Sequence, residues 1–294
     1  APDAPSVGSL AALTNDNTVV ISITAEAGST VRVYDGATLL GIATEESAGN
    51  FSLTTTPLAD GAHSITATAT DATGNLSSAS AAVAFTVDTQ PPAAPTLALE
   101  SDTGSSSTDG ITSANTVNVI GLESGASWQY SVDGGTWTAG TGSSFSLTAG
   151  AHTYQVRQTD AAGNLSGSSD ALTYTLESAA PTVTITDDRS ATTNGVITYT
   201  FTFSEAVTGF SAADITVGNG TKGVFTQLSD TAFTLTVTPD ANEEGTVTVD
   251  VPAGAAQDLA GNDSLAATQS SQPFDTLAPD APSVGSLAAL TNDN

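Results

Sequence analysis

Apolar and polar residues alternate over short runs along the whole chain. The run "SWQYSVDGG" places Trp128, Tyr130 and Val132 on one face of an extended segment, and "AHTYQVRQT" does the same for Tyr154 and Val156. The runs "HSITATAT", "VITYTFTF" and "AFTLTVT" repeat the pattern elsewhere. A period of two residues predicts antiparallel strands with one buried face.

Glycine, proline, asparagine and aspartate separate these runs, and no stretch shows the apolar period of an amphipathic helix. About seven short strands in every 90 or so residues are typical of an immunoglobulin-like (Ig-like) sandwich. The predicted fold class is therefore all-β: tandem Ig-like β-sandwiches, three domains end to end plus the first strand of a fourth.

Two levels of repetition set the predicted domains. Residues 1–17 and 278–294 both read "APDAPSVGSLAALTNDN", which indicates a repeating block of 277 residues (278 − 1) in a longer parent chain. Within the block, the turns "TDATGN", "TDAAGN" and "QDLAGN" place an aspartate at positions 71, 160 and 258. We therefore expect Ig-like domains at 1–89, 90–178 and 179–277, with 278–294 beginning the next repeat.

The chain is strongly acidic, with 4 basic and 31 acidic residues and a formal net charge of −27 at pH 7. This charge argues against nucleic acid and against anionic membrane surfaces as partners, because both bind to basic patches. Cysteine is absent from the sequence, which excludes disulfides and thiolate metal sites. No apolar run has the roughly 18 residues needed to cross a bilayer, so we expect no direct membrane insertion. The start at Ala1, without a recognisable leader, suggests a segment of something longer.

Acidic residues recur where neighbouring domains are expected to meet. In an Ig-like sandwich, the loops after the second and sixth strands lie at the end where the chain enters. The first loop carries a glutamate, the second is the repeated turn, and a stiff proline-bearing linker brings a third acid. The predicted sets are Asp88, Glu123 and Asp160 at the first junction; Glu177, Glu205 and Asp258 at the second; and, between blocks, Asp275 with the counterparts of Glu26 and Asp71.

Three carboxylates at one small junction repel one another unless a cation lies between them. Calcium accepts oxygen ligands in a loose geometry, including amide oxygens such as those of Asn75, Asn164 and Asn262, whereas magnesium demands a strict octahedron. We therefore predict structural Ca²⁺ at the junctions. The acidic loops around Asp16 and at 101–110, at the exit end of their domains, are additional candidates to join these sites. The alternative is that the aspartates and asparagines only form turns, with a glycine supplying the positive backbone angle.

Other chemistry is less well supported by the sequence. His63 and His152 occupy matching positions in different domains, without a serine motif, so we expect strand packing and no enzyme. Trp128 and Trp137 could form a sugar-stacking pair, but the alternation makes Trp128 a core residue. Glycan binding therefore stays an alternative.

The "TDAAGNLS" turn, the "SVDGGTW" hairpin, the "DTGSSSTDGIT" loop and "FSEAVTGFSAADITVGNG" resemble the bacterial Ig-like repeats of giant type I-secreted surface adhesins of the biofilm-associated or RTX type. The resemblance covers all three domains, although Glu177 stands where the other linkers have aspartate. It implies an extracellular location on a Gram-negative cell and a structural extender rod rigidified by interdomain calcium. Its partners would be neighbouring repeats of the same chain. The alternative function is a glycan-binding or self-associating module of an extracellular matrix filament.

Overall fold

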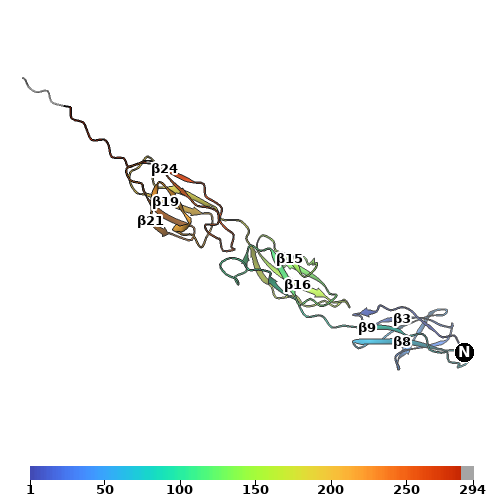
Figure 1. The fold of residues 1–294 in the computed structure, drawn as a ribbon. Coiled ribbons are helices and arrows are strands. Elements are labelled where there is room, and N and C mark those ends of the chain that lie inside the picture. The colour runs from blue at the N-terminus through green and yellow to red at the C-terminus, as the bar shows by residue number, and fades with distance from the viewer. Residues whose placement is uncertain (286–294) are drawn as a thin grey trace, which may run out of the picture. The chain divides into compact units, whose positions relative to one another are not determined.

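The computed structural model describes residues 1–285 as an all-β chain (Figure 1). Residues 286–294, which belong to the predicted start of the next repeat, lie outside the described part. In residues 1–285, η1 (Ala212–Asp214) is a single 3-10 turn, and no helix is long and apolar enough to cross a membrane. Two compact units are formed: the first from 1–100, 116–147 and 152–173, the second from 101–115, 148–151 and 174 onward.

The first unit begins with a sandwich of two sheets (Figure 1). One sheet has the order β1-β3-β7-β6, and the other has the order β2-β9-β8-β4-β5. All pairs are antiparallel except β2 with β9, which is parallel. The strands are β1 (Ser6–Val7), β2 (Leu13–Thr14), β3 (Val20–Thr24), β4 (Thr30–Asp35), β5 (Thr38–Ile42), β6 (Thr44–Ser47), β7 (Asn50–Thr54), β8 (Gly61–Thr70) and β9 (Val83–Val87).

The core of this sandwich follows the predicted alternation. In β8, Ile65, Ala67 and Ala69 have no exposed surface, and they pack in one cluster with Ile21 of β3 and Phe51 of β7. Every second residue is therefore removed from water, which is the main source of stability of a half-buried sheet.

The rest of the first unit is built in the same way. The strands β10 (Thr96–Leu99), β12 (Thr116–Ile120) and β15 (Ser144–Ser146) form one sheet, while β13 (Ser127–Val132) pairs with β14 (Thr138–Ala139) and with β16 (Gly150–Thr159).

The aromatic face predicted from the alternation forms as expected, with one departure at the hairpin. Tyr154 is fully buried, Trp128 is 4% exposed, and Tyr130 stacks on Phe145 at 4.5 Å between ring centroids. The departure is Ser131 on the opposite face, which is buried because its Oγ donates to the Gly135 carbonyl across the turn.

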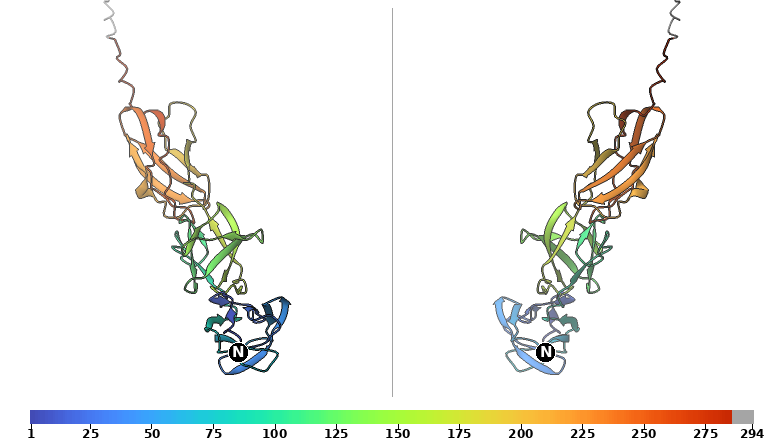
Figure 2. Two further views of the ribbon diagram at one scale, coloured as in Figure 1. Left: turned by 90° about the vertical axis from the view of Figure 1, so that its right-hand side faces the viewer. Right: turned by 90° about the vertical axis from the view of Figure 1, so that its left-hand side faces the viewer.

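The second unit holds the third sandwich, seen from two sides in Figure 2. Its sheets have the orders β18-β19-β22-β21 and β20-β23-β24, and its core contains Tyr199, Phe201, Leu235 and Val247. In the same unit, the short strand β11 (Ile111–Thr112) runs parallel to β17 (Leu172–Leu176). The strands of the third sandwich are β18 (Val183–Asp187), β19 (Ile197–Phe203), β20 (Thr216–Gly218), β21 (Gly220–Gln227), β22 (Ala232–Pro239), β23 (Glu244–Asp250) and β24 (Ser270–Asp275).

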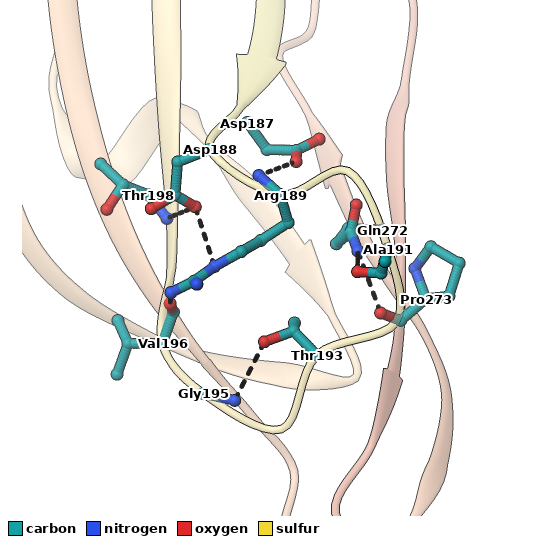
Figure 3. Close-up of polar contacts among 10 residues, drawn as sticks. All are labelled: Asp187, Asp188, Arg189, Ala191, Thr193, Gly195, Val196, Thr198, Gln272 and Pro273. Carbon is teal, nitrogen blue, oxygen red and sulfur yellow. Dashed lines mark hydrogen bonds and ion pairs between the residues drawn. The ribbon is translucent and has the colours of Figure 1, made fainter.

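The loop between β18 and β19 is braced by polar contacts inside the third sandwich (Figure 3). The backbone N–H of Arg189 donates to Asp187. The Arg189 guanidinium lies 3.2 Å from Asp188 and also donates to the Val196 carbonyl. Gln272 of β24 donates to the Ala191 carbonyl from the neighbouring sheet. This loop is the counterpart of residues 100–110 between β10 and β11.

The alternating pattern and the matched sheets confirm the predicted all-β, Ig-like fold class. The exact boundaries at 89/90, 178/179 and 277/278 stay predictions.

Both histidines fasten the start of a long strand to a hairpin turn, as expected for strand packing. His63 Nδ1 lies 2.7 Å from Asp35 Oδ2, and its Nε2 lies 2.8 Å from the Ala59 carbonyl. Because both ring nitrogens face acceptors, the site fits the protonated imidazolium. The hydrogen bond to Asp35 raises the pKa of His63 from 6.5. His152 repeats the contact with Asp133 at 2.6 Å.

We predict that the first sandwich loses stability as the pH rises above 6.5. A folded-state pKa raised above the unfolded value of 6.5 gives a contribution that is complete below that pH and is lost as the pH rises through the raised pKa. Urea unfolding should be followed through NMR signals of β8, since a chain of several sandwiches does not unfold in two states. His63→Gln should abolish this pH dependence, whereas His152→Gln should leave it intact. An unchanged slope in His63→Gln would contradict the prediction.

Candidate metal centre

The three repeated turns share one hydrogen-bonded geometry. In each turn, the aspartate Oδ1 accepts the asparagine backbone N–H, and its Oδ2 accepts the asparagine side-chain N–H. The glycine before each asparagine has a positive φ, as predicted, which a side chain would strain. The aspartates and asparagines are thus turn-formers. The pairs are Asp71 with Asn75, Asp160 with Asn164 and Asp258 with Asn262, with glycine φ values of 88°, 104° and 87°.

A serine two residues after each asparagine completes the turn. Ser77, Ser166 and Ser264 are buried, and the Oγ of each accepts a backbone N–H of the strand segment beside it, at 2.9, 2.9 and 3.2 Å. The sequence interpretation missed these serines, although their fixed spacing from the asparagine is a visible signal.

The turn hydrogen bonds keep two of the aspartates ionised. Those from Asn75 and Thr73 hold the pKa of Asp71 far below its usual range. For Asp160, burial alone would raise the pKa, but hydrogen bonds from Asn164 and Gly163 lower it overall. Each carboxylate is charged at neutral pH, and a cation could still approach the second lone pair of either oxygen.

The three linker acids have a common backbone setting. The N–H groups of Asp88, Glu177 and Asp275 donate to Thr14, Thr112 and Thr193 carbonyls at 2.9, 3.0 and 3.0 Å. A side-chain oxygen of each accepts the N–H two residues further on, at 3.1, 2.8 and 3.0 Å. Their side chains are therefore held at the start of the linker.

At the first junction, the structure joins the linker to the turn through the backbone. Asn164 Nδ2 donates to the Asp88 carbonyl at 2.7 Å, and Asn164 is only 8% exposed. The Glu123 side chain is exposed on its loop, and Asp88 is half-buried. The contacts thus connect Asp88 with the Asp160 turn and place Glu123 at the same end of the sandwich.

Gln158 fixes the loop that carries Glu123. Its side chain is fully buried; Oε1 accepts the Glu123 N–H at 2.9 Å, and Nε2 donates to the carbonyls of Ala93 and Gly121 at 2.8 and 3.1 Å. The sequence interpretation missed Gln158, because a glutamine on the inward face of a strand is read as an exception to the alternation.

At the second junction, all three predicted acids line one hollow. Burial raises the pKa of Glu205, and the negative charges of Asp258 and Glu177 raise it further. Asp258 is only 2% exposed, and Asn262 Nδ2 donates to the Glu177 carbonyl at 3.0 Å. A hollow of about 250 Å³ is lined by Ile111, Thr175, Glu177, Glu205, Ala206, Asp258, Leu259 and Ala260.

The donor set of the second junction fits a hard divalent cation, since it contains only oxygen ligands whose charges repel one another. Within residues 1–285, however, no three acidic or histidine side chains already converge closely enough to hold a metal ion. Calcium at either junction would therefore require the carboxylates to draw closer. The set between blocks pairs Asp275 with counterparts of Glu26 and Asp71 in a neighbouring copy, and it stays a prediction.

The two loops named as additional candidates lie close to the turns. The Asn15 side chain lies beside Gly163, where a β-carbon would come within 3.2 Å of its Nδ2. Thr103 Oγ1 donates to the Ala260 carbonyl at 2.5 Å. The acids of these loops are engaged locally: Asp16 accepts from Thr18, and Asp102 accepts from Gly110.

Comparison with known proteins identifies the class. Residues 7–89 match a family described as "Bacterial Ig-like domain", and residues 177–274 match a second family with the same description. These two segments are bacterial Ig-like domains.

Individual relatives are more distant. Exoglucanase B of Cellulomonas fimi is 34% identical over 223 residues, which is 72% of this chain and 20% of that protein. A tetra-tandem repeat in the extending region of a large adhesion protein is 22% identical, with a TM-score of 0.30 over 94% of this chain and 75% of the other. Invasin, a bacterial integrin-binding protein, is 16% identical, with a TM-score of 0.37 over 92% and 59%.

We predict that Gln158→Ala lowers the free energy of unfolding by about 1–3 kcal/mol, because it leaves buried backbone groups of the linker and loop unpaired. Fluorescence of Trp128 and Trp137 during urea unfolding measures this cost. Gln155→Ala, on the half-buried face of the same strand, is the matched control and should cost less. Equal costs for the two variants would contradict the assigned role.

Proposed function

We propose that this chain is a structural extender segment of a bacterial cell-surface adhesin, in which Ca²⁺ between neighbouring Ig-like domains stiffens the junctions. The observation that carries the proposal is the second junction, where Glu177, Glu205 and Asp258 line one hollow and the pKa of Glu205 is raised. Repulsion of this kind favours a site that gains a cation.

The residues that would hold the ion are the three acids of each junction. Bound calcium would supply positive charge and would accept oxygen ligands from all three acids. The chain's own contribution is positional: the turn fixes its aspartate, the buried Gln158 fixes the loop of Glu123, and the linker acid is fixed by its backbone. An ion that binds the ordered junction better than the loose one stabilises the ordered state by linkage.

The biological setting is proposed from composition and class. A net charge of −27 suits a soluble, repulsive surface that does not bind nucleic acid. Secretion by a Gram-negative cell, a biofilm role and contacts with neighbouring repeats follow from the resemblance in sequence. No catalytic role is proposed.

Glycan binding is the second candidate, because the relative from C. fimi is named an exoglucanase. The aromatic residues offer little support. Trp128 is in the core, and the half-buried Trp137 has the Arg157 guanidinium 4.2 Å above its ring. A sugar would have to stack on the remaining surface of one ring.

Removal of calcium should weaken the first junction. In chelator, melting should occur at lower temperature, and the distribution of particle lengths in small-angle scattering should broaden at a lower temperature than it does in calcium. A site with free calcium about 100-fold above its Kd contributes about 2.7 kcal/mol. Glu123→Gln should reduce the calcium effect, whereas Asp170→Asn, an exposed acid outside the junctions, should not. Identical scattering and melting with calcium and with chelator would refute the calcium proposal.

Glu205→Gln should stabilise the chain when calcium is absent and reduce the stabilisation that calcium gives. A carboxyl group whose folded pKa is raised weakens the folded state when ionised, and this loss is relieved as the pH falls through the raised pKa. In chelator at neutral pH, the variant should therefore melt at a higher temperature than the parent chain. Added calcium should raise the melting temperature of the variant by less than it raises that of the parent chain. Calorimetry with Asp170→Asn, the exposed acid outside the junctions, as the control tests this. A variant that melts below the parent chain in chelator would contradict the assignment.

A further inference from the structure

The linker acid at each described junction makes backbone hydrogen bonds on two sides, through its own N–H and C=O groups. On one side, its N–H donates to the threonine carbonyl of the short strand β2 or β11 of the sandwich it leaves. On the other side, its carbonyl accepts from Asn164 or Asn262 of the turn that follows. None of these contacts uses a carboxylate or a metal.

Both N–H donors of the asparagine side chain are used in this arrangement. One is given to the aspartate Oδ2 at 2.8 Å, and the other to the linker carbonyl at 2.7 Å for Asn164 and 3.0 Å for Asn262. The acceptor of the second hydrogen is a main-chain atom, so the contact does not depend on the side chain of the linker acid. It is the same at Asp88 and at Glu177, although their side chains differ.

The first sandwich supplies an internal comparison. Asn75 has the same bond to its aspartate at 2.8 Å, but its amide also donates to Thr73 Oγ1 at 2.8 Å, within the turn. Its surroundings differ too: Asn75 is exposed, whereas Asn164 is buried. The internal bonds of the turn therefore form without a linker carbonyl, and at Asn164 and Asn262 the linker contact is made in addition to them.

The second junction has a further contact of the same kind. Besides the hydrogen bond from Thr103 to the Ala260 carbonyl, Gly104 packs so closely that a β-carbon would lie 2.0 Å from the Leu259 carbonyl oxygen. At the first junction, the corresponding loop contributes the Asn15 side chain beside Gly163. The second junction is thus closed by backbone packing as well as by its asparagine.

We propose that the repeated turn is a docking site for the linker of the preceding domain, in which Asn164 and Asn262 bind the carbonyl of the linker acid and hold the junction without a metal. Thr103 and Gly104 add a second clamp at the second junction. Loss of one asparagine therefore opens the first junction more readily than the second. This docking goes beyond the calcium proposal and does not depend on it.

The substitution of asparagine by aspartate separates the two ideas. If Asn164 acted as a calcium ligand, Asn164→Asp would add charge and strengthen the site. In the docking site, the new carboxylate would face the Asp160 carboxylate and the Asp88 carbonyl with no hydrogen to donate. Docking therefore predicts that Asn164→Asp is at least as harmful as Asn164→Ala in the presence of calcium as well as in chelator.

The test is NMR of the 294-residue chain in excess chelator, so that failure of the calcium proposal does not affect it. Residual dipolar couplings of residues 6–87 and of residues 116–147 should fit one common alignment tensor, as expected when the junction between the two sandwiches is held. Asn164→Ala and Asn164→Asp should abolish the common alignment, while Asn75→Ala should preserve it. The side-chain amide hydrogens of Asn164 should exchange about tenfold more slowly than those of Asn75. Unchanged strand signals would show that the variants fold.

At the second junction, Asn262→Ala should keep the common alignment of residues 101–115 and 183–275, and its combination with Thr103→Val should lose it. Separate alignments in the parent chain under chelator would overturn the proposal. So would a common alignment that survives Asn164→Asp, or its loss in Asn75→Ala.

Discussion

The peptide groups of the linker acid are the point on which each junction depends. A linker that leaves a sheet exposes N–H and C=O groups, and these must be satisfied either by water or by the protein. Here the N–H is satisfied by the sandwich that ends, and the C=O by the turn of the sandwich that begins. One residue thereby couples two folded bodies through its backbone, and the acidic side chain is placed at the same spot.

The acidity of the junctions follows a different logic at each site. Asp160 is a carboxylate satisfied by N–H donors, so its charge is accommodated and its pKa is lowered. Glu205 is partly buried beside two other acids, so its charge is costly and its pKa is raised. The aspartate of the repeated turn is thus stabilised in its charged form, whereas the glutamate of the other loop is destabilised in its charged form at the second junction.

The sequence predicted what depends on local spacing. Alternation identified the buried faces of β8 and β16, and the glycine of each repeated turn adopts the expected positive φ. Topology alone also placed Glu177, Glu205 and Asp258 at one end of the third sandwich, where all three line one hollow. The sequence did not predict Gln158 or the Thr103 contact, because both depend on which carbonyl a distant segment presents. Such contacts leave no period in the sequence.

The proposed extender role would benefit from two kinds of stabilisation that respond to different conditions. Hydrogen bonds to backbone carbonyls are short-ranged and directional, so they fix how a linker meets a turn whatever the ionic surroundings. Carboxylates act over a longer range and depend on whether cations are available. Because the asparagine and the aspartate belong to one turn, the directional contact positions the charged one. The proposed order of assembly follows: the hydrogen bonds bring the acids to one end of the sandwich, and their mutual repulsion would favour the binding of a cation there.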